Sequence, residues 1–145
     1  MGKLLGIPEW VAATGFVVAA LAVWLGAGFI LLRRAHARLA ARRPSPSEAE
    51  FLAMMAQDCS PEAARFVWGQ ALPYVSPRLT PHPDDLLIGD LCIDDDDIDM
   101  DWARDWADQF GIPERDLPEW PKEWPLTVRN FARWCDLART NARAA

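Results

Sequence analysis

The stretch WVAATGFVVAALAVWLGAGFILL, residues 10–32, decides the architecture of this 145-residue chain. Its 23 residues include no charged side chain. At about 1.5 Å of rise per residue, a helix of this length reaches roughly 34 Å, and a hydrocarbon layer of about 30 Å can be crossed by it. A buried helix of a small soluble protein does not use such a length. The stretch therefore predicts a single membrane-spanning helix.

The charges on either side of this stretch predict its orientation. A cluster of arginines follows it with no acid before Glu48, whereas only Lys3, the amino terminus and Glu9 carry charge ahead of it. The arginines are Arg33, Arg34, Arg38, Arg42 and Arg43. Because positively charged flanks stay on the cytoplasmic side, we expect a single-pass protein of the cell inner membrane with its N-terminus outside. A cleaved signal peptide is the alternative, but its charges precede the apolar run, which is the reverse of the order here.

Small residues line one face of the apolar stretch. Gly15, Ala19, Ala22 and Gly26 follow one another at intervals of four, three and four residues. Such spacing permits close approach of a second helix, so a homodimer is one hypothesis. The other interpretation is that Gly is simply frequent in membrane helices.

Charge divides the chain into two unlike parts. Residues 1–43 carry six Lys/Arg against one acid, a net +5, and residues 44–145 carry nine against twenty, a net −11. The acidic part repels phosphate backbones, which excludes nucleic acid and favours basic protein surfaces or cations as partners. The three cysteines, Cys59, Cys92 and Cys135, form no CxxC or Cys/His motif. We therefore expect a reducing compartment and no zinc site, and we expect the cysteines to act as small apolar core residues.

Residues 44–145 show helix signals and no β-type alternation. Pro44-Ser45-Pro46 breaks the chain after the arginines and predicts a hinge. A capping box, Ser47 with Glu50, opens a short helix through Met55, and Ser60-Pro61-Glu62 opens a second one through Leu72. We therefore expect an all-α fold in three parts: an anchor with its basic flank at 1–43, a hinge and short helix at 44–59, and an acidic helical domain at 60–145.

The rest of this domain follows from its prolines and apolar spacing. Residues 73–93 hold four prolines and predict a long loop held by its leucines and isoleucines. A third helix begins among Asp94–Asp97, where carboxylates cap free N–H groups, and ends at Gly111. The repeated Glu-Trp-Pro unit of residues 118–125 cannot form regular helix. A last helix follows Thr127, with apolar residues three or four positions apart.

A resemblance covers roughly residues 60–140. The string DLCIDDDDI at 90–98, a helix ending in FGIP at 110–113 and a last helix beginning LTV at 126–128 together resemble an acyl carrier protein. More narrowly they resemble an uncharacterised bacterial family of acyl-carrier-protein-like domains of unknown function. The motif of that family reads Asp-Leu-Gly-Ile-Asp-Gly-Asp-Asp, and Cys92 and Asp95 stand at its glycines. The resemblance implies a carrier-shaped helical bundle behind an added transmembrane anchor.

This chain departs from true carriers at the attachment residue. A carrier holds its phosphopantetheine arm on a serine at the start of its second long helix, and here that position falls within Asp94–Asp97. The four serines of the chain lie upstream, at Ser45, Ser47, Ser60 and Ser76. We therefore expect no cofactor. A carrier that uses an unexpected acceptor residue is the alternative.

What the resemblance leaves is an acidic helix that docks on basic proteins. The face expected to bind a partner consists of Asp96, Asp97, Asp99, Asp101, Asp105 and Asp108, on the helix of residues 96–110. A solvated helix face without a partner is the other interpretation. Charge also permits a membrane-bound inhibitor or immunity protein that neutralises a basic toxin.

The aspartate run matches no established metal motif. An EF-hand loop fails because Ile98 or Trp102 stands at a required position, and a DDxxD string at Asp95 belongs to enzymes whose large cavity this chain cannot enclose. Weak divalent-cation binding remains open, with Asp94, Asp95, Asp96 and Asp97 as candidates.

No constellation of catalytic residues is visible, so we expect that the protein is not an enzyme. His36 lies among the arginines, where an interfacial position is expected, and His82 lies near Asp84 and Asp85 in a proline-rich loop. No phosphate-binding loop or nucleophile elbow occurs. The tryptophans read as bulky core residues, although Trp120 and Trp124, among prolines, also suit a peptide-docking surface.

Overall fold

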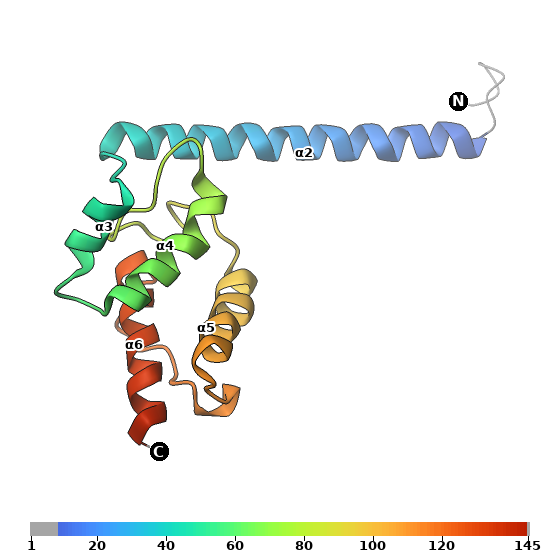
Figure 1. Cartoon of the computed structure of the whole chain (residues 1–145). Helices are drawn as coiled ribbons and strands as arrows, with labels where there is room; N and C mark the ends of the chain where they lie inside the picture. The colour runs from blue at the N-terminus through green and yellow to red at the C-terminus, as the bar shows by residue number, and fades with distance from the viewer. Residues whose placement is uncertain (1–8, 145) are drawn as a thin grey trace. The chain divides into compact units, whose positions relative to one another are not determined.

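The structure is a computed structural model that describes residues 9–144, and its regular elements are helices (Figure 1). They are α2 (Glu9–Arg42), α3 (Glu48–Met55), α4 (Pro61–Val75), the π-helix η1 (Asp97–Trp102), α5 (Ala103–Phe110), the 3-10 helix η2 (Glu114–Asp116) and α6 (Val128–Ala144). Residues 9–144 form no strand, and one isolated antiparallel bridge joins Leu86 to Thr127. The expected all-α class is confirmed. Lys3 lies outside the described residues.

The chain divides into two compact units, one ending at Ala35 and one beginning at His36. The first holds most of α2. Between Trp10 and Arg42 this helix is long and apolar enough to cross a membrane. The small residues Gly15, Ala19, Ala22 and Gly26 are all exposed on it. A helix over residues 10–32 is confirmed, and it continues ten residues past Leu32, to Arg42.

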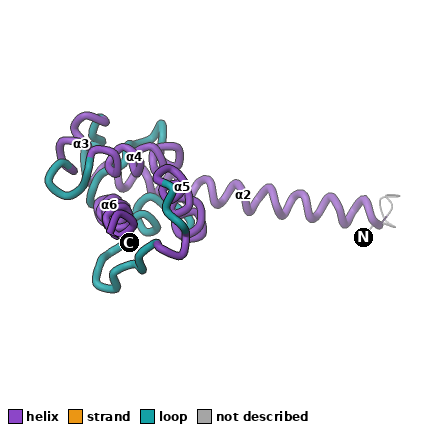
Figure 2. The backbone as a smooth tube through the Cα atoms, turned by 60° about the horizontal axis from the view of Figure 1, so that its bottom comes forward, coloured by secondary structure: helices purple, strands orange, loops and turns teal. Residues whose placement is uncertain are grey.

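The second unit is a helical bundle built around α4. Helix α4 contacts both α3 and α6, and α6 also contacts α5 (Figure 1). Two long connections, between α4 and η1 and between α5 and α6, complete the unit (Figure 2). The largest fully buried side chains come from both helices and connections; among them are Trp102, Trp106, Phe51, Met55, Leu87, Leu91, Ile93 and Ile98. At about 25 cal/mol per Å² of apolar surface, indole rings are the largest single contributors to such a core.

The local signals of the sequence produce the expected helix ends. The side chain of Ser47 accepts a hydrogen bond from the Glu50 N–H, and the Glu50 carboxylate accepts one from the Ser47 N–H. The Ser60 hydroxyl accepts a hydrogen bond from the Ala63 N–H at the start of α4, and Pro61 is the first residue of that helix. Gly111 ends α5 with φ 63°, in the left-handed region that favours glycine. These predictions are confirmed. Each depends on interactions between residues that are close in the sequence, which is why the sequence predicts them.

Two helices differ in detail from the expectation. Helix α4 continues through Pro73 to Val75, since a proline two residues before a helix end removes only one hydrogen bond. The third helix opens as a π-helix over Asp97–Trp102 before it becomes α-helical. The side chains of Ile98, Trp102 and Trp106 are nevertheless all buried, as the apolar stripe predicted.

The second unit begins inside the arginine cluster, ahead of the Pro44–Pro46 hinge. His36 is fully buried, and its Nδ1 accepts a hydrogen bond from Arg78 Nε at 3.1 Å. Because a guanidinium only donates, Nε2 carries the imidazole proton and donates it to the Leu91 carbonyl at 3.1 Å. The interfacial position expected for His36 is therefore not what the structure shows. His36 is buried because the loop that contains Leu91 packs against this helix. The sequence alone does not predict that long-range contact.

Arg43 also belongs to this unit. Its Nε donates to Asp85 Oδ1 at 2.8 Å, and its Nη2 donates to Asp85 Oδ2 and to the Thr80 carbonyl. The Asp85 side chain is 3% exposed and that of Arg43 11%. Burial raises the pKa of the Asp85 carboxyl, and the Arg43 hydrogen bond acts in the opposite direction. The segment after α2 breaks where Pro44 and Pro46 predict, but Arg43 and Pro46 are held by the domain, because Thr80 Oγ1 also donates to the Pro46 carbonyl at 2.6 Å.

Candidate functional site

The acidic residues concentrate on one segment of the second unit. Residues 84–108 contain eleven of the twenty acids of residues 44–145, and Arg104 is the only Lys or Arg among them. The buried side chains of Leu87, Leu91 and Ile93 hold the preceding loop in place. The helical segment then begins at Asp95, and the carboxylate of Asp94 just before it accepts a hydrogen bond from the Asp96 N–H at 3.1 Å. The expected cap among Asp94–Asp97 is confirmed, and it directs the aspartates that follow along one helix.

The six aspartates expected to bind a partner fall into two groups. Asp97 accepts a hydrogen bond from Tyr74 Oη at 2.8 Å, and Asp105 accepts one from Gln70 Nε2 at 2.9 Å. These two carboxylates help to join the acidic helix to α4. The other four are exposed and form no ion pair with another described residue; they are Asp96, Asp99, Asp101 and Asp108.

The lone arginine of this segment does not neutralise them. Arg104 Nε donates to Glu114 Oε1 at 2.9 Å. Its pKa is raised, chiefly by this hydrogen bond, with smaller contributions from the charges of Asp101 and Asp108. Since Arg104 is committed to Glu114, the exposed aspartates keep a strongly negative surface.

Apolar side chains are exposed beside the aspartates. Ile88 is 48% exposed and Met100 55%, and they belong to a short set of large apolar residues exposed in the described part of the second unit. Ile88 lines a shallow hollow together with Cys92 and Asp94. Exposed apolar groups next to unpaired charges are typical of protein interfaces, where an apolar centre has a polar rim.

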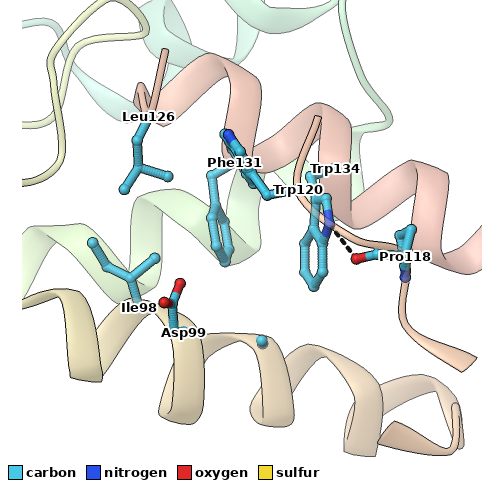
Figure 3. Close-up of a pocket in the computed structure, with 8 residues that line it drawn as sticks. Ile98, Asp99, Pro118, Trp120, Leu126, Phe131 and Trp134 are labelled. Atoms are coloured by element: carbon cyan, nitrogen blue, oxygen red, sulfur yellow. Dashed lines mark hydrogen bonds between the residues drawn. The ribbon is translucent and has the colours of Figure 1, made fainter. Parts of the chain in front are cut away.

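A cleft of about 270 Å³ lies between η1, the start of α5 and α6 (Figure 3). Its aromatic side comes from Trp120, Phe131 and Trp134, and its aliphatic side from Ile98, Ala103 and Leu126, with Pro118 beside them. Asp99 points into the space from η1 and is the one ionisable residue that lines it (Figure 3).

Both indole N–H groups of this cleft have partners within the protein. Trp134 Nε1 donates to the Pro118 carbonyl at 3.1 Å, and Trp120 Nε1 donates to the Trp124 carbonyl at 3.0 Å. The first bond joins the Glu-Trp-Pro segment to α6, and the second lies within that segment. The indoles therefore offer carbon surface to the cleft, and the Asp99 carboxylate is its polar group.

The other candidate residues do not come together. Among the described residues no group of three or more His, Cys, Asp or Glu side chains is placed to hold a metal ion, and this includes Asp94–Asp97. His82 Nδ1 lies 3.9 Å from Asp84 Oδ2, and its backbone N–H donates to Asp85 Oδ2. Of the topology arginines, Arg33, Arg34, Arg38 and Arg42 are exposed, whereas Arg43 forms the buried pair with Asp85.

The three cysteines differ in exposure. Cys135 is fully buried, Cys59 is half-buried and Cys92 is exposed. Burial raises the pKa of Cys59 to about 12 and that of Cys135 well above its usual range, and it also raises the pKa of Cys92. No described cysteine therefore has the lowered pKa of a reactive nucleophile.

Comparisons with protein-family models, with curated proteins and with solved structures found no match to this chain. The geometry of the acidic helix and its cleft therefore carries the functional argument. Sequence reasoning identified the aspartates but missed the cleft, because its walls come from residues up to 36 positions apart, from Ile98 to Trp134. The only signal for it was the unusual Glu-Trp-Pro segment.

Proposed function

We propose that this protein is a membrane-tethered interaction module that docks a basic protein through the acidic surface of η1 and α5. In this proposal the protein binds its partner and catalyses no reaction. The surface consists of the exposed Asp96, Asp99, Asp101 and Asp108 with the exposed side chain of Met100.

The observation that carries the proposal is that no Lys or Arg of the described chain forms an ion pair with these four carboxylates. None of the four forms an ion pair within the described chain, although the second unit contains nine Lys/Arg after residue 43. Several of those cations are used elsewhere: Arg129 pairs with Asp58 and Asp84, and Arg104 with Glu114. Clustered like charges repel each other, so an approaching basic surface relieves that repulsion and is also steered toward it.

The anchor sets where such a partner is met. In this proposal α2 spans the cell inner membrane, the N-terminus lies outside and the acidic domain lies in the cytoplasm. The basic residues Arg33, Arg34, Arg38 and Arg42 after the apolar stretch support this orientation through the positive-inside rule. Tethering confines the module to the membrane surface and raises its local concentration for partners found there.

The likeness to acyl-carrier-like domains is part of the proposal. Cys92 has φ 58°, a backbone conformation that favours glycine, and the family motif has glycine at this position. The helix that would carry the phosphopantetheine serine is preceded here by Asp94 and begins with Asp95 and Asp96. These features support a carrier-shaped docking domain without the carrier's covalent chemistry.

Charge reversal tests the docking surface. A variant of the full chain with Asp99, Asp101 and Asp108 changed to lysine is compared with wild type by crosslinking in native membranes and mass spectrometry. We expect loss of one or more basic proteins that wild type captures, and weaker capture at high salt because the contact is electrostatic.

A matched control changes the same number of charges elsewhere. Glu62, Glu119 and Glu123 are exposed and lie outside the acidic helix, so their reversal to lysine gives the same net charge. This control is expected to capture the wild-type partners. Equal capture by both triple variants, or equal loss, would contradict a specific docking surface.

The exposed Cys92 tests the topology. A membrane-impermeant maleimide added to intact spheroplasts should leave the protein unlabelled and should label Cys92 after permeabilisation, because the domain is expected inside. Labelling before permeabilisation would place the domain outside the cell membrane.

A further inference from the structure

We infer that the cleft beside Asp99 is a seat for a single arginine side chain of the basic partner. The guanidinium would lie against the aromatic wall and donate its hydrogen bonds to the Asp99 carboxylate. This inference rests on the proposed function and adds the residue type that the docking surface recognises.

The chemistry of the lining selects a cation. Asp99 is the only ionisable side chain that lines the cleft, and it is an acceptor. The indole N–H groups of Trp120 and Trp134 donate to backbone carbonyls within the protein and are not available to a ligand. An anion would meet no donor side chain and one negative charge. A cationic side chain with an apolar stem can donate to the Asp99 carboxylate and place its stem against the apolar side chains of the cleft.

The shape of the lining favours arginine over lysine. Trp120 is partly exposed beside the space that Asp99 enters, and Phe131 and Trp134, which are 3% and 5% exposed, complete its aromatic wall (Figure 3). A planar guanidinium stacks on aromatic rings and pairs with a carboxylate through two parallel donors, whereas an ammonium is a compact, strongly hydrated charge. Ile98 and Leu126 suit the methylene stem, because long cationic side chains bury their stems on apolar surface.

The same contact already occurs within this chain. The guanidinium carbon of Arg133 lies 4.2 Å from the ring centre of Trp124, and that of Arg139 lies 4.5 Å from the ring centre of Phe110. These two arginines cover aromatic rings of the second unit outside the cleft. The rings of Trp120 and Trp134 beside Asp99 have no such cation among the described contacts.

The size of the cleft fits one side chain. Its volume of about 270 Å³ is below the range of about 300–1,000 Å³ of sites that enclose a whole small molecule. A second hollow shares Asp99 and Ala103 with the cleft and is also lined by Met100, Arg104 and Leu117. A partner segment can therefore lie across the helix and place one arginine into the cleft.

Peptide binding tests the inference on the full chain in nanodiscs of zwitterionic lipid. The probes are the capped peptide acetyl-Ala-Arg-Ala-Lys-amide and the same peptide with citrulline in place of arginine, which removes the charge and keeps the shape. The readout is the shift of the indole N–H resonances of Trp120 and Trp134. We expect the arginine peptide to shift both indole resonances, with an affinity at least tenfold weaker for D99N and unchanged for E62Q, which removes one negative charge from an exposed residue outside the docking surface.

Three outcomes would overturn the inference: equal binding of the two peptides, equal weakening by D99N and E62Q, or no shift of either indole at millimolar peptide. Unchanged near-ultraviolet circular dichroism of D99N is the check that the variant keeps its fold, and D99E, which keeps the charge, should retain binding. Partner capture separates this result from the proposed function. If triple reversal abolishes capture but D99N and E62Q bind the arginine peptide equally, the docking surface stands and the arginine seat fails.

Discussion

Replacement of Arg43 by alanine should destabilise the domain far more than the same replacement at Arg42. Arg43 forms a two-pronged pair with Asp85, whose side chain is 3% exposed, and also donates to the Thr80 carbonyl at 2.9 Å. Removal of one member of a buried ion pair leaves an uncompensated charge and costs about 3–5 kcal/mol. We take the lower end, about 3 kcal/mol, because the Arg43 side chain retains 11% exposure.

The assay is thermal unfolding of the full chain in detergent, followed by near-ultraviolet circular dichroism of the buried tryptophans. For a unit that runs from His36 to the end of the chain, a loss of about 3 kcal/mol corresponds to a fall in Tm of about 12 °C or more. Arg42 is exposed and one residue away, so Arg42→Ala removes the same charge and should change stability by less than about 0.5 kcal/mol.

The cost should also depend on pH with a definite sign. Burial raises the pKa of Asp85 from its ordinary 3.8, so the folded state holds this proton more tightly than the unfolded state. The stability from this group is therefore present at low pH and is lost as pH rises through the folded pKa. Without Arg43 that folded pKa rises further. Arg43→Ala should consequently cost less at pH 4 than at pH 7, and equal losses for Arg43→Ala and Arg42→Ala at pH 7 would refute the reasoning.

Three further predictions concern residues of the core and the thiols. At Cys92, φ 58° favours glycine, so Cys92→Gly should be about 1 kcal/mol more stable than Cys92→Ala in denaturant unfolding, and equal midpoints would contradict the strained position. Trp106 is fully buried and its Nε1 donates to the Cys135 carbonyl at 2.8 Å, so Trp106→Phe should cost about 1–3 kcal/mol in the same assay, since a buried hydrogen bond is lost and the smaller ring leaves a cavity. A thiol reagent should modify Cys92 in the folded protein and should modify Cys59 and Cys135 mainly after unfolding. The rate of modification of Cys92 should still increase above pH 9, because the pKa of this thiol is raised. Rapid labelling of Cys135 in the folded protein, detected by peptide mass spectrometry, would contradict its burial.

The sequence alone determined the features that depend on neighbours along the chain. The uncharged run of residues 10–32 predicts the apolar part of α2, the Ser47 and Ser60 caps set where α3 and α4 begin, and Gly111 ends α5. Each follows from backbone hydrogen bonding and local sterics, which a periodic pattern or a capping residue reports directly. The spacing of Ile98, Trp102 and Trp106 also predicted their burial correctly.

Tertiary structure decided which of the neighbouring charged residues form hydrogen bonds or ion pairs with other parts of the chain. Arg42 and Arg43 are neighbours in one basic cluster, yet only Arg43 meets a buried carboxylate, 42 residues away at Asp85. Asp97 and Asp105 are bound by Tyr74 and Gln70, while Asp99 faces a cleft. Such partners come from distant segments, and long-range packing brings them within hydrogen-bonding distance. The local pattern carries the charge of each residue, and the fold decides whether that charge is compensated or exposed to a partner.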